Sequence, residues 1–203
     1  MSYVPSMRTP RTNPRSPLVF DTRTLGRQPG SEYRETRVVP APPDLHLALA
    51  RVPVGTGVEL TVMLEVMPDG VLVTAEASAP VTGECARCLE PVTTSVQVSF
   101  RELYEREADT AGGEDTEDDR RFLDGDLLDL EPALRDAMVL ALPLAPLCRD
   151  DCAGLCPECG VRLADAGPAH EHDAALDPRW ARLQELKSET HSSGARAADR
   201  QEG

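Results

Sequence analysis

Aromatic residues, lysines and long apolar runs are all scarce in this chain of 203 residues. Only three Phe, three Tyr and one Trp are present, so we expect a core built mainly from aliphatic side chains. No run of about eighteen or more apolar residues occurs, so we expect no transmembrane helix. Residues 1–17 contain no apolar stretch, and we therefore expect no secretory signal peptide.

Positively charged residues are also few compared with acidic ones. The chain holds 21 Lys and Arg against 35 Asp and Glu, which gives a formal net charge of −14. This balance excludes a strongly basic protein that coats nucleic acid, because such binding depends on many Lys and Arg contacts with phosphates. The charge is uneven along the chain: residues 1–40 carry seven Arg and three acidic residues, so the remainder is near −18.

Sequence motifs of common catalytic sites are missing as well. There is no Gly-rich phosphate loop, no G-x-S-x-G and no H-E-x-x-H. The acidic residues of 109–119 show no periodicity and are typical of a solvated loop. We therefore expect no catalytic residues, no small-molecule substrate and no enzymatic activity.

Apolar and polar residues alternate between residues 45 and 105, which is typical of half-buried strands. Pro68-Asp69-Gly70 supplies a turn between two of these strands, since Pro fixes φ and Gly accepts a positive φ. The pattern predicts an antiparallel sheet over 45–105 that could curl toward a barrel. A short strand at 18–20 precedes it.

Helical segments and a cysteine-rich segment follow the predicted sheet. Asp129 can cap a packed helix over 129–142, with Pro132 in its first turn, and a C-terminal helix over 178–188 begins at Asp177-Pro178. Between them lies a cysteine knuckle over 148–160. The fold class is therefore α+β, with an exposed acidic loop over 108–125. We expect one domain over 18–188, flanked by disordered tails over 1–17 and 189–203.

The cysteines fall into three close pairs. Without an export signal they should lie in a reducing, cytoplasmic compartment, where structural disulfides are rare. Two cysteines separated by two residues can bind one metal ion if a tight turn lies between them, and Gly or Pro helps to form that turn. The pairs predict structural zinc, with these candidate ligands: Cys85, Cys88, Cys148, Cys152, Cys156 and Cys159.

Three groupings of these ligands are open. The first is local and joins the four cysteines between 148 and 159. The second joins the pair at 85 and 88 with the pair at 156 and 159. The third makes two sites, in which Cys148 and Cys152 complete the first pair, while His170 and His172 are additional candidate ligands beside Cys156 and Cys159.

Other interpretations of the same residues are weaker. Free cysteines are often buried as small apolar side chains, but clustering into three pairs argues against this. A thioredoxin-like role needs a C-x-x-C that opens a helix in a βαβ unit, and neither pair has that setting. A catalytic zinc site keeps an open coordination position and has a general base nearby. The sequence shows no candidate for such a base beside the cysteines, so catalytic zinc is a weaker interpretation.

A set of segments resembles the YceD family of bacterial and plastid proteins, known as large ribosomal RNA subunit accumulation proteins. Phe20-Asp21, Leu25-Gly26 and Pro29-Gly30 come first. Cys85-Ala86-Arg87-Cys88-Leu89-Glu90-Pro91 follows, then Gly154-Leu155-Cys156-Pro157-Glu158-Cys159-Gly160, then Asp177-Pro178-Arg179. The resemblance covers roughly residues 18–188.

The resemblance implies a role in the accumulation of large-subunit (23S) ribosomal RNA and in ribosome biogenesis. Family members share the C-x-x-C at Cys85 and Cys88, and are often encoded beside a small zinc-binding protein of the large subunit. No catalytic residue can be transferred. Some relatives carry further cysteines where this chain has His170-Glu171-His172.

We expect a non-enzymatic assembly factor whose partner is precursor ribosomal RNA, a basic large-subunit ribosomal protein, or both. The acidic charge favours the protein partner. The Arg-bearing N-terminal arm could still reach RNA, although no nucleic-acid-binding residue is identified. The alternative is a redox-sensitive, chaperone-like zinc module, and a zinc-dependent nuclease ranks below both. We expect no membrane partner.

Overall fold

The structure is a computed structural model, and it describes residues 12–106, 120–167 and 169–172. The chain divides into two compact units, residues 1–154 and residues 155–203. The predicted C-terminal helix over 178–188, the tail over 189–203 and most of the acidic loop lie outside the described residues. Among those residues, no helix is long and apolar enough to cross a membrane.

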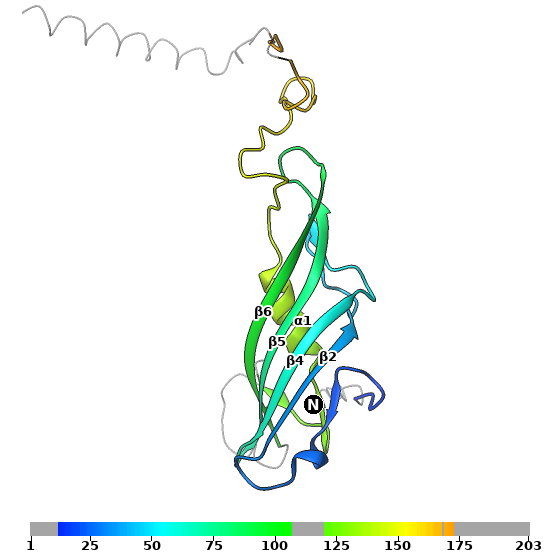
Figure 1. Cartoon of the computed structure of the whole chain (residues 1–203), viewed down its shortest axis with the longest axis vertical. Helices are drawn as coiled ribbons and strands as arrows, with labels where there is room; N and C mark the ends of the chain where they lie inside the picture. Colours follow the sequence, from blue (N-terminus) through cyan, green and yellow to red (C-terminus); the bar gives the residue numbers. More distant parts are fainter. Residues whose placement is uncertain (1–11, 107–119, 168, 173–203) are drawn as a thin grey trace, which may run out of the picture. The chain divides into compact units, whose positions relative to one another are not determined.

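The first unit is built on a largely antiparallel sheet (Figure 1). Four long strands lie in the order β2 (Glu32–Pro40), β4 (Gly57–Val66), β5 (Gly70–Glu84) and β6 (Pro91–Glu105). Two short strands extend the sheet: β3 (Ala50–Arg51) pairs with β5, and β7 (Arg121–Phe122) runs parallel to β6. Within the described residues the sheet stays open, so the barrel-like part of the prediction is wrong.

A small second sheet and the helix complete this unit. Strand β1 (Val19–Asp21) leads into a short 3-10 helix, η1 (Thr22–Leu25), and pairs with β8 (Leu127–Asp129). The chain then enters helix α1 (Glu131–Ala141). The N-cap residue is Leu130, which makes no side-chain cap hydrogen bond, so the prediction of Asp129 as the cap is wrong. Asp129 lies one residue earlier, and its Oδ1 still accepts the Glu131 N–H at 3.0 Å.

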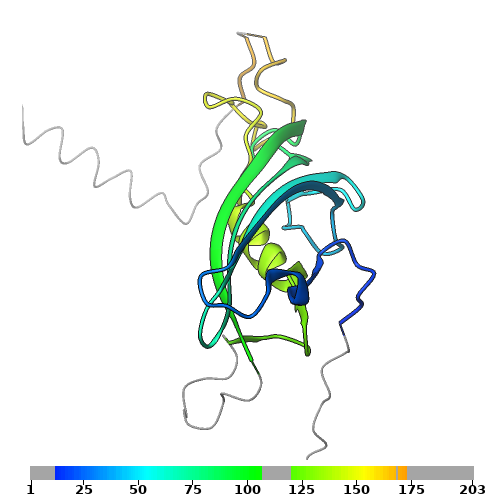
Figure 2. The ribbon, with the colours of Figure 1, turned by 60° about the horizontal axis from the view of Figure 1, so that its bottom comes forward.

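Helix α1 packs on one face of the curved sheet, as Figures 1 and 2 both show. The predicted alternation sets this face: in β4 every second residue from Val58 to Val66 is buried, and in β5 the same holds from Val71 to Val81. From the helix, Leu134 and Met138 enter the same cluster fully buried. Leu142 is buried just beyond the helix, whereas Ala141, the last helical residue, is exposed.

The edge strand β2 lies outside the sheet predicted over 45–105. Only Val39 of its nine residues is buried, so its sequence lacks the alternation that reveals β4 and β5. Strand β2 is held in the sheet by antiparallel pairing with β4, in a register that places Glu32 opposite Glu65 and Pro40 opposite Gly57. Arg37 of β2 also lies 4.0 Å above the ring of Phe20.

Strands β5 and β6 form a hairpin with fifteen residues in each arm, paired from Gly70↔Glu105 to Glu84↔Pro91. At about 3.3 Å per residue, each arm spans about 50 Å. The closed end of this hairpin is the segment that contains Cys85 and Cys88. On its outer edge, β6 is covered by β7 only at Tyr104 and Glu105 among the described residues.

The packing of α1 gives a direct test of this architecture. Replacing Leu134 by Ala should lower the free energy of unfolding by about 2–5 kcal/mol, because the side chain is fully buried against the sheet. Leu140, on the same helix, is 87% exposed, and Leu140→Ala should change that free energy by less than about 0.5 kcal/mol. Urea denaturation measures both. Equal effects of the two substitutions would contradict the placement of the helix.

Candidate metal centres

The cysteines and two of the histidines converge in two separate clusters. Cluster 1 contains Cys85, Cys88, Cys148 and Cys152, all in the first unit. Cluster 2 contains Cys156, Cys159, His170 and His172, all in the second unit. In each cluster the four donor atoms lie within 4.8 Å of one another. The residues that converge are therefore those of the third grouping.

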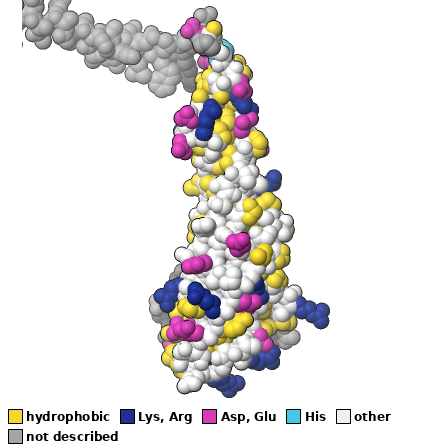
Figure 3. All heavy atoms as spheres, in the orientation of Figure 1, with side chains coloured by type: hydrophobic (Ala, Val, Ile, Leu, Met, Phe, Trp, Pro, Cys, Tyr) yellow, Lys and Arg dark blue, Asp and Glu magenta, His cyan; other side chains and the backbone are white. Residues whose placement is uncertain are grey.

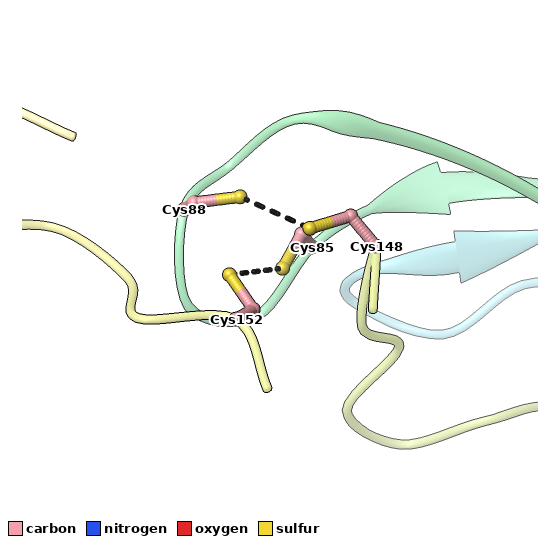
Figure 4. A group of neighbouring side chains, drawn as sticks. All are labelled: Cys85, Cys88, Cys148 and Cys152. Atoms are coloured by element: carbon pink, nitrogen blue, oxygen red, sulfur yellow. Dashed lines mark hydrogen bonds between the residues drawn. The ribbon is translucent and has the colours of Figure 1, made fainter. Parts of the chain in front are cut away.

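Cluster 1 joins the closed end of the β5–β6 hairpin to the chain beyond α1 (Figure 4). The Cys85 Sγ lies 3.8 Å from the Cys152 Sγ, and the Cys88 Sγ lies 3.6 Å from the Cys148 Sγ. These separations are far longer than a disulfide bond of about 2.05 Å, and all the cysteines are free. Cys85, Cys88 and Cys152 are buried, whereas Cys148 is exposed.

Two hydrogen bonds hold the returning chain against the hairpin end. The Ala86 N–H donates to the Pro146 carbonyl at 2.8 Å, and the Arg87 guanidinium donates to the Cys152 carbonyl at 2.9 Å. Gly154 follows with φ of +82°, and a Cβ at this position would lie 3.1 Å from the Arg87 carbonyl oxygen. Sequence reasoning missed Arg87 and Gly154, because neither role is visible before the two segments are brought together.

Both C-x-x-C segments form the same turn. In cluster 1 the Cys85 N–H donates to the Glu90 carbonyl at 2.7 Å, and the Leu89 N–H donates to the Cys85 carbonyl at 2.9 Å. In cluster 2 the Cys156 N–H donates to the Val161 carbonyl, and the Gly160 N–H donates to the Cys156 carbonyl, both at 2.8 Å. The spacing identified both turns in advance.

Hydrogen-bond donors around the two turns lower the pKa of the first cysteine of each pair. Burial raises the pKa of the Cys85 thiol, but N–H groups of Cys148, Arg87 and Cys88 outweigh burial and lower this pKa to about 6. His170, aided by the Cys159 N–H, lowers the pKa of the Cys156 thiol to about 6. Desolvation raises the pKa of the Cys148 thiol to about 12. Crowded thiols cannot all ionise unless a cation offsets their mutual repulsion.

Cluster 2 places the two histidines beside the cysteine turn. The Cys159 Sγ lies 3.7 Å from the His170 Nε2, and the His170 and His172 Nε2 atoms are 3.1 Å apart. The two imidazole rings meet edge to face at an interplanar angle of 86°. Although the sequence offered these histidines only as additional ligands, the structure brings both to the cysteine pair.

The chain is similar to proteins of one known family. The family model described as "Large ribosomal RNA subunit accumulation protein YceD" matches residues 73–187. An uncharacterized protein of Mycobacterium tuberculosis, Rv2926c, is 44% identical over 173 residues, covering 84% of this chain and 82% of the relative. An uncharacterized protein of Mycobacterium leprae, ML1660, is 39% identical over the same share of this chain and 78% of its own length. No solved structure matches.

The close approach of Gly154 to Arg87 predicts a measurable effect of one methyl group. Gly125 and Gly154 both have positive φ, but a Cβ at Gly125 would meet nothing within 4 Å. Gly125→Ala should therefore cost only the backbone strain, about 1–2 kcal/mol of unfolding free energy. Gly154→Ala should cost more, because it also crowds the Arg87 carbonyl. Denaturant unfolding of both variants checks this, and a smaller loss for Gly154→Ala would contradict the contact.

Proposed function

The chain belongs to the YceD family of large ribosomal RNA subunit accumulation proteins, and from this premise we propose that it promotes accumulation or processing of 23S ribosomal RNA in the cytoplasm. The observation that carries this proposal is the family match, which spans more than half of the chain. The relatives that align over most of its length are themselves uncharacterized, so they support the family and not a mechanism.

Zinc is the metal that best fits cluster 1. Zinc prefers four thiolate or imidazole ligands in a tetrahedron, with Zn–S bonds of about 2.3 Å. Such a tetrahedron separates neighbouring sulfur atoms by about 3.8 Å. The observed Sγ–Sγ distances of 3.8 and 3.6 Å agree with this edge length. Cys85, Cys88, Cys148 and Cys152 would hold the ion.

Cluster 2 fits the same ion with a mixed donor set. Zn–N bonds of about 2.0–2.1 Å in a tetrahedron place two nitrogen atoms about 3.3 Å apart, close to the 3.1 Å between the His170 and His172 Nε2 atoms. Cys156 and Cys159 would complete this set. Cys156 is the only buried side chain among the described residues from 155 to 172, so packing alone gives this segment little stability.

The donor sets favour structural over catalytic zinc. Each cluster supplies four protein ligands, which fill a tetrahedral site and leave no position for water or substrate. An ion in cluster 1 would fix the hairpin end to the chain after α1. We therefore propose a non-enzymatic factor whose metal ions hold its shape.

Charge favours a protein as the direct partner. The net charge of −14 opposes contact with RNA phosphates. In the part of the surface that Figure 3 shows, Arg side chains are scattered among acidic and uncharged ones, without a continuous basic stripe. A basic large-subunit ribosomal protein would complement this surface, and precursor ribosomal RNA would then be affected through it.

The alternative of a redox-sensitive zinc module is not favoured. A reactive cysteine needs a lowered pKa together with exposure. Cys85 and Cys156 have lowered pKa values but are buried, whereas the exposed Cys148 has a raised pKa. No exposed thiol among these three has the reactive combination.

The zinc proposal predicts metal content. Protein purified without chelator should contain about two zinc ions per chain, because two complete donor sets are present. Cys85→Ser/Cys88→Ser and Cys156→Ser/Cys159→Ser should each retain about one ion, since the clusters share no ligand. Elemental analysis measures this, with the exposed Ala153→Ser as a control that should keep both. Less than about half an ion in the wild-type protein would refute the four-ligand sites.

The cellular role predicts a change in ribosomal RNA. Depleting the protein should lower the ratio of large-subunit to small-subunit ribosomal RNA, and wild-type protein should restore it. Cys85→Ser/Cys88→Ser should not restore it, because the hairpin end would lose its link to Cys148 and Cys152. The test is to quantify both RNAs in depleted cells. An unchanged ratio of large-subunit to small-subunit ribosomal RNA after depletion would contradict the proposed function.

A further inference from the structure

The two C-x-x-C turns have the same backbone geometry, but they carry different types of residue at one position. The residue after the second cysteine donates the hydrogen bond that closes each turn, and it has a positive φ in both: +61° at Leu89 and +72° at Gly160. Glycine accepts this backbone conformation without strain, whereas a side chain meets its own carbonyl oxygen there. The turn of cluster 1 is therefore strained at Leu89, and the turn of cluster 2 is not strained at Gly160.

Packing within the described chain does not account for this strain. The Leu89 side chain is 58% exposed and does not belong to the hydrophobic core. Its backbone hydrogen bond does not require a side chain, since Gly160 makes the equivalent bond. Strained residues that the fold itself does not need occur mainly at sites of function.

We propose that Leu89 is a partner-contact residue, whose side chain enters an apolar pocket on a basic polypeptide. The identity of the partner class rests on the proposed function, in which a basic protein of the large subunit is the direct partner. Burial of this one side chain would contribute about 10- to 100-fold in affinity.

The chemistry around Leu89 favours a polypeptide over RNA. Leucine has no ring on which a base could stack and no hydrogen-bond donor for a base edge. The nearby Arg87 guanidinium already donates to the Cys152 carbonyl. Acidic residues outnumber basic ones in the two segments that meet here. These are Glu84, Glu90, Asp150 and Asp151, against Arg87 and Arg149.

The surroundings also make Leu89 a rigid contact. It follows Cys88 of cluster 1 and lies at the closed end of a hairpin paired without interruption over fifteen residues. A side chain carried on a backbone that is already ordered costs less conformational entropy on binding, because only its own rotamers are restricted. A Leu in a flexible loop would not have this advantage.

The test uses substitutions that separate stability from function. Leu89→Gly should leave the zinc content unchanged and leave the unfolding midpoint unchanged or higher, because it relieves the strain. The same variant should fail to restore the ribosomal RNA ratio in depleted cells, whereas Leu89→Met, which keeps an apolar side chain, should restore it. Leu140→Ala is the matched control, since Leu140 is an 87% exposed leucine on helix α1, outside the cysteine turns, and this variant should behave as wild type.

A photo-crosslinking amino acid at position 89 of the full chain identifies the partner. The expected adduct is a polypeptide of net positive charge that sediments with large-subunit precursors. Once purified, that polypeptide should bind the wild-type chain about 10- to 100-fold more tightly than Leu89→Gly. An adduct with RNA, no adduct, or equal binding of the two chains would overturn the inference.

The outcomes also separate this inference from the proposed function. If wild-type protein restores the RNA ratio and Leu89→Gly restores it equally, the contact role of Leu89 is wrong and the proposed function stands. If depletion leaves the ratio unchanged, the proposed function is wrong. The crosslink and the affinity difference then still decide whether Leu89 contacts a basic polypeptide.

Discussion

The register between β5 and β6 is the constraint on which the rest of the first unit depends. Fifteen residues of each strand pair without a bulge. Because side chains alternate between the two faces of a strand, a shift of one residue would turn the apolar face of β5 toward solvent. The same shift would move the Cys85–Cys88 turn away from Cys148 and Cys152. One set of backbone hydrogen bonds therefore determines both the core and the position of cluster 1.

The second requirement is that the chain returns to the hairpin end after leaving it. Strand β6 carries the chain about 50 Å away, and β8, α1 and the segment after Leu142 bring it back. Burial of Leu134 and Met138 fixes the helix on the sheet, and the Pro146 carbonyl then accepts the Ala86 N–H. Core packing thus positions Cys148 and Cys152 before any metal is considered.

Local patterns could be predicted from the sequence, and their assembly could not. The alternation at Val58–Val66 identifies β4, and Pro132 marks the first turn of α1, because both signals act over a few residues. The sequence does not reveal strand β2, because a mostly exposed edge strand carries no alternation of buried and exposed residues. The sequence does not show that Cys85 and Cys88 meet Cys148 and Cys152, because spacing shows which residues share a turn and not which turns meet. The strain at Leu89 becomes visible only when its φ is compared with that of Gly160.

The outer edge of β6 has a consequence for behaviour at high concentration. Residues 92–100 of this strand contain no charge, proline or glycine, and among the described residues β7 covers only Tyr104 and Glu105. Such an edge can template pairing with another copy, the first step of aggregation. Mutual repulsion between chains of net charge −14 opposes that encounter. The net negative charge thus opposes pairing at the part of the β6 edge that no described strand covers, and this protection weakens as salt shortens the range of repulsion.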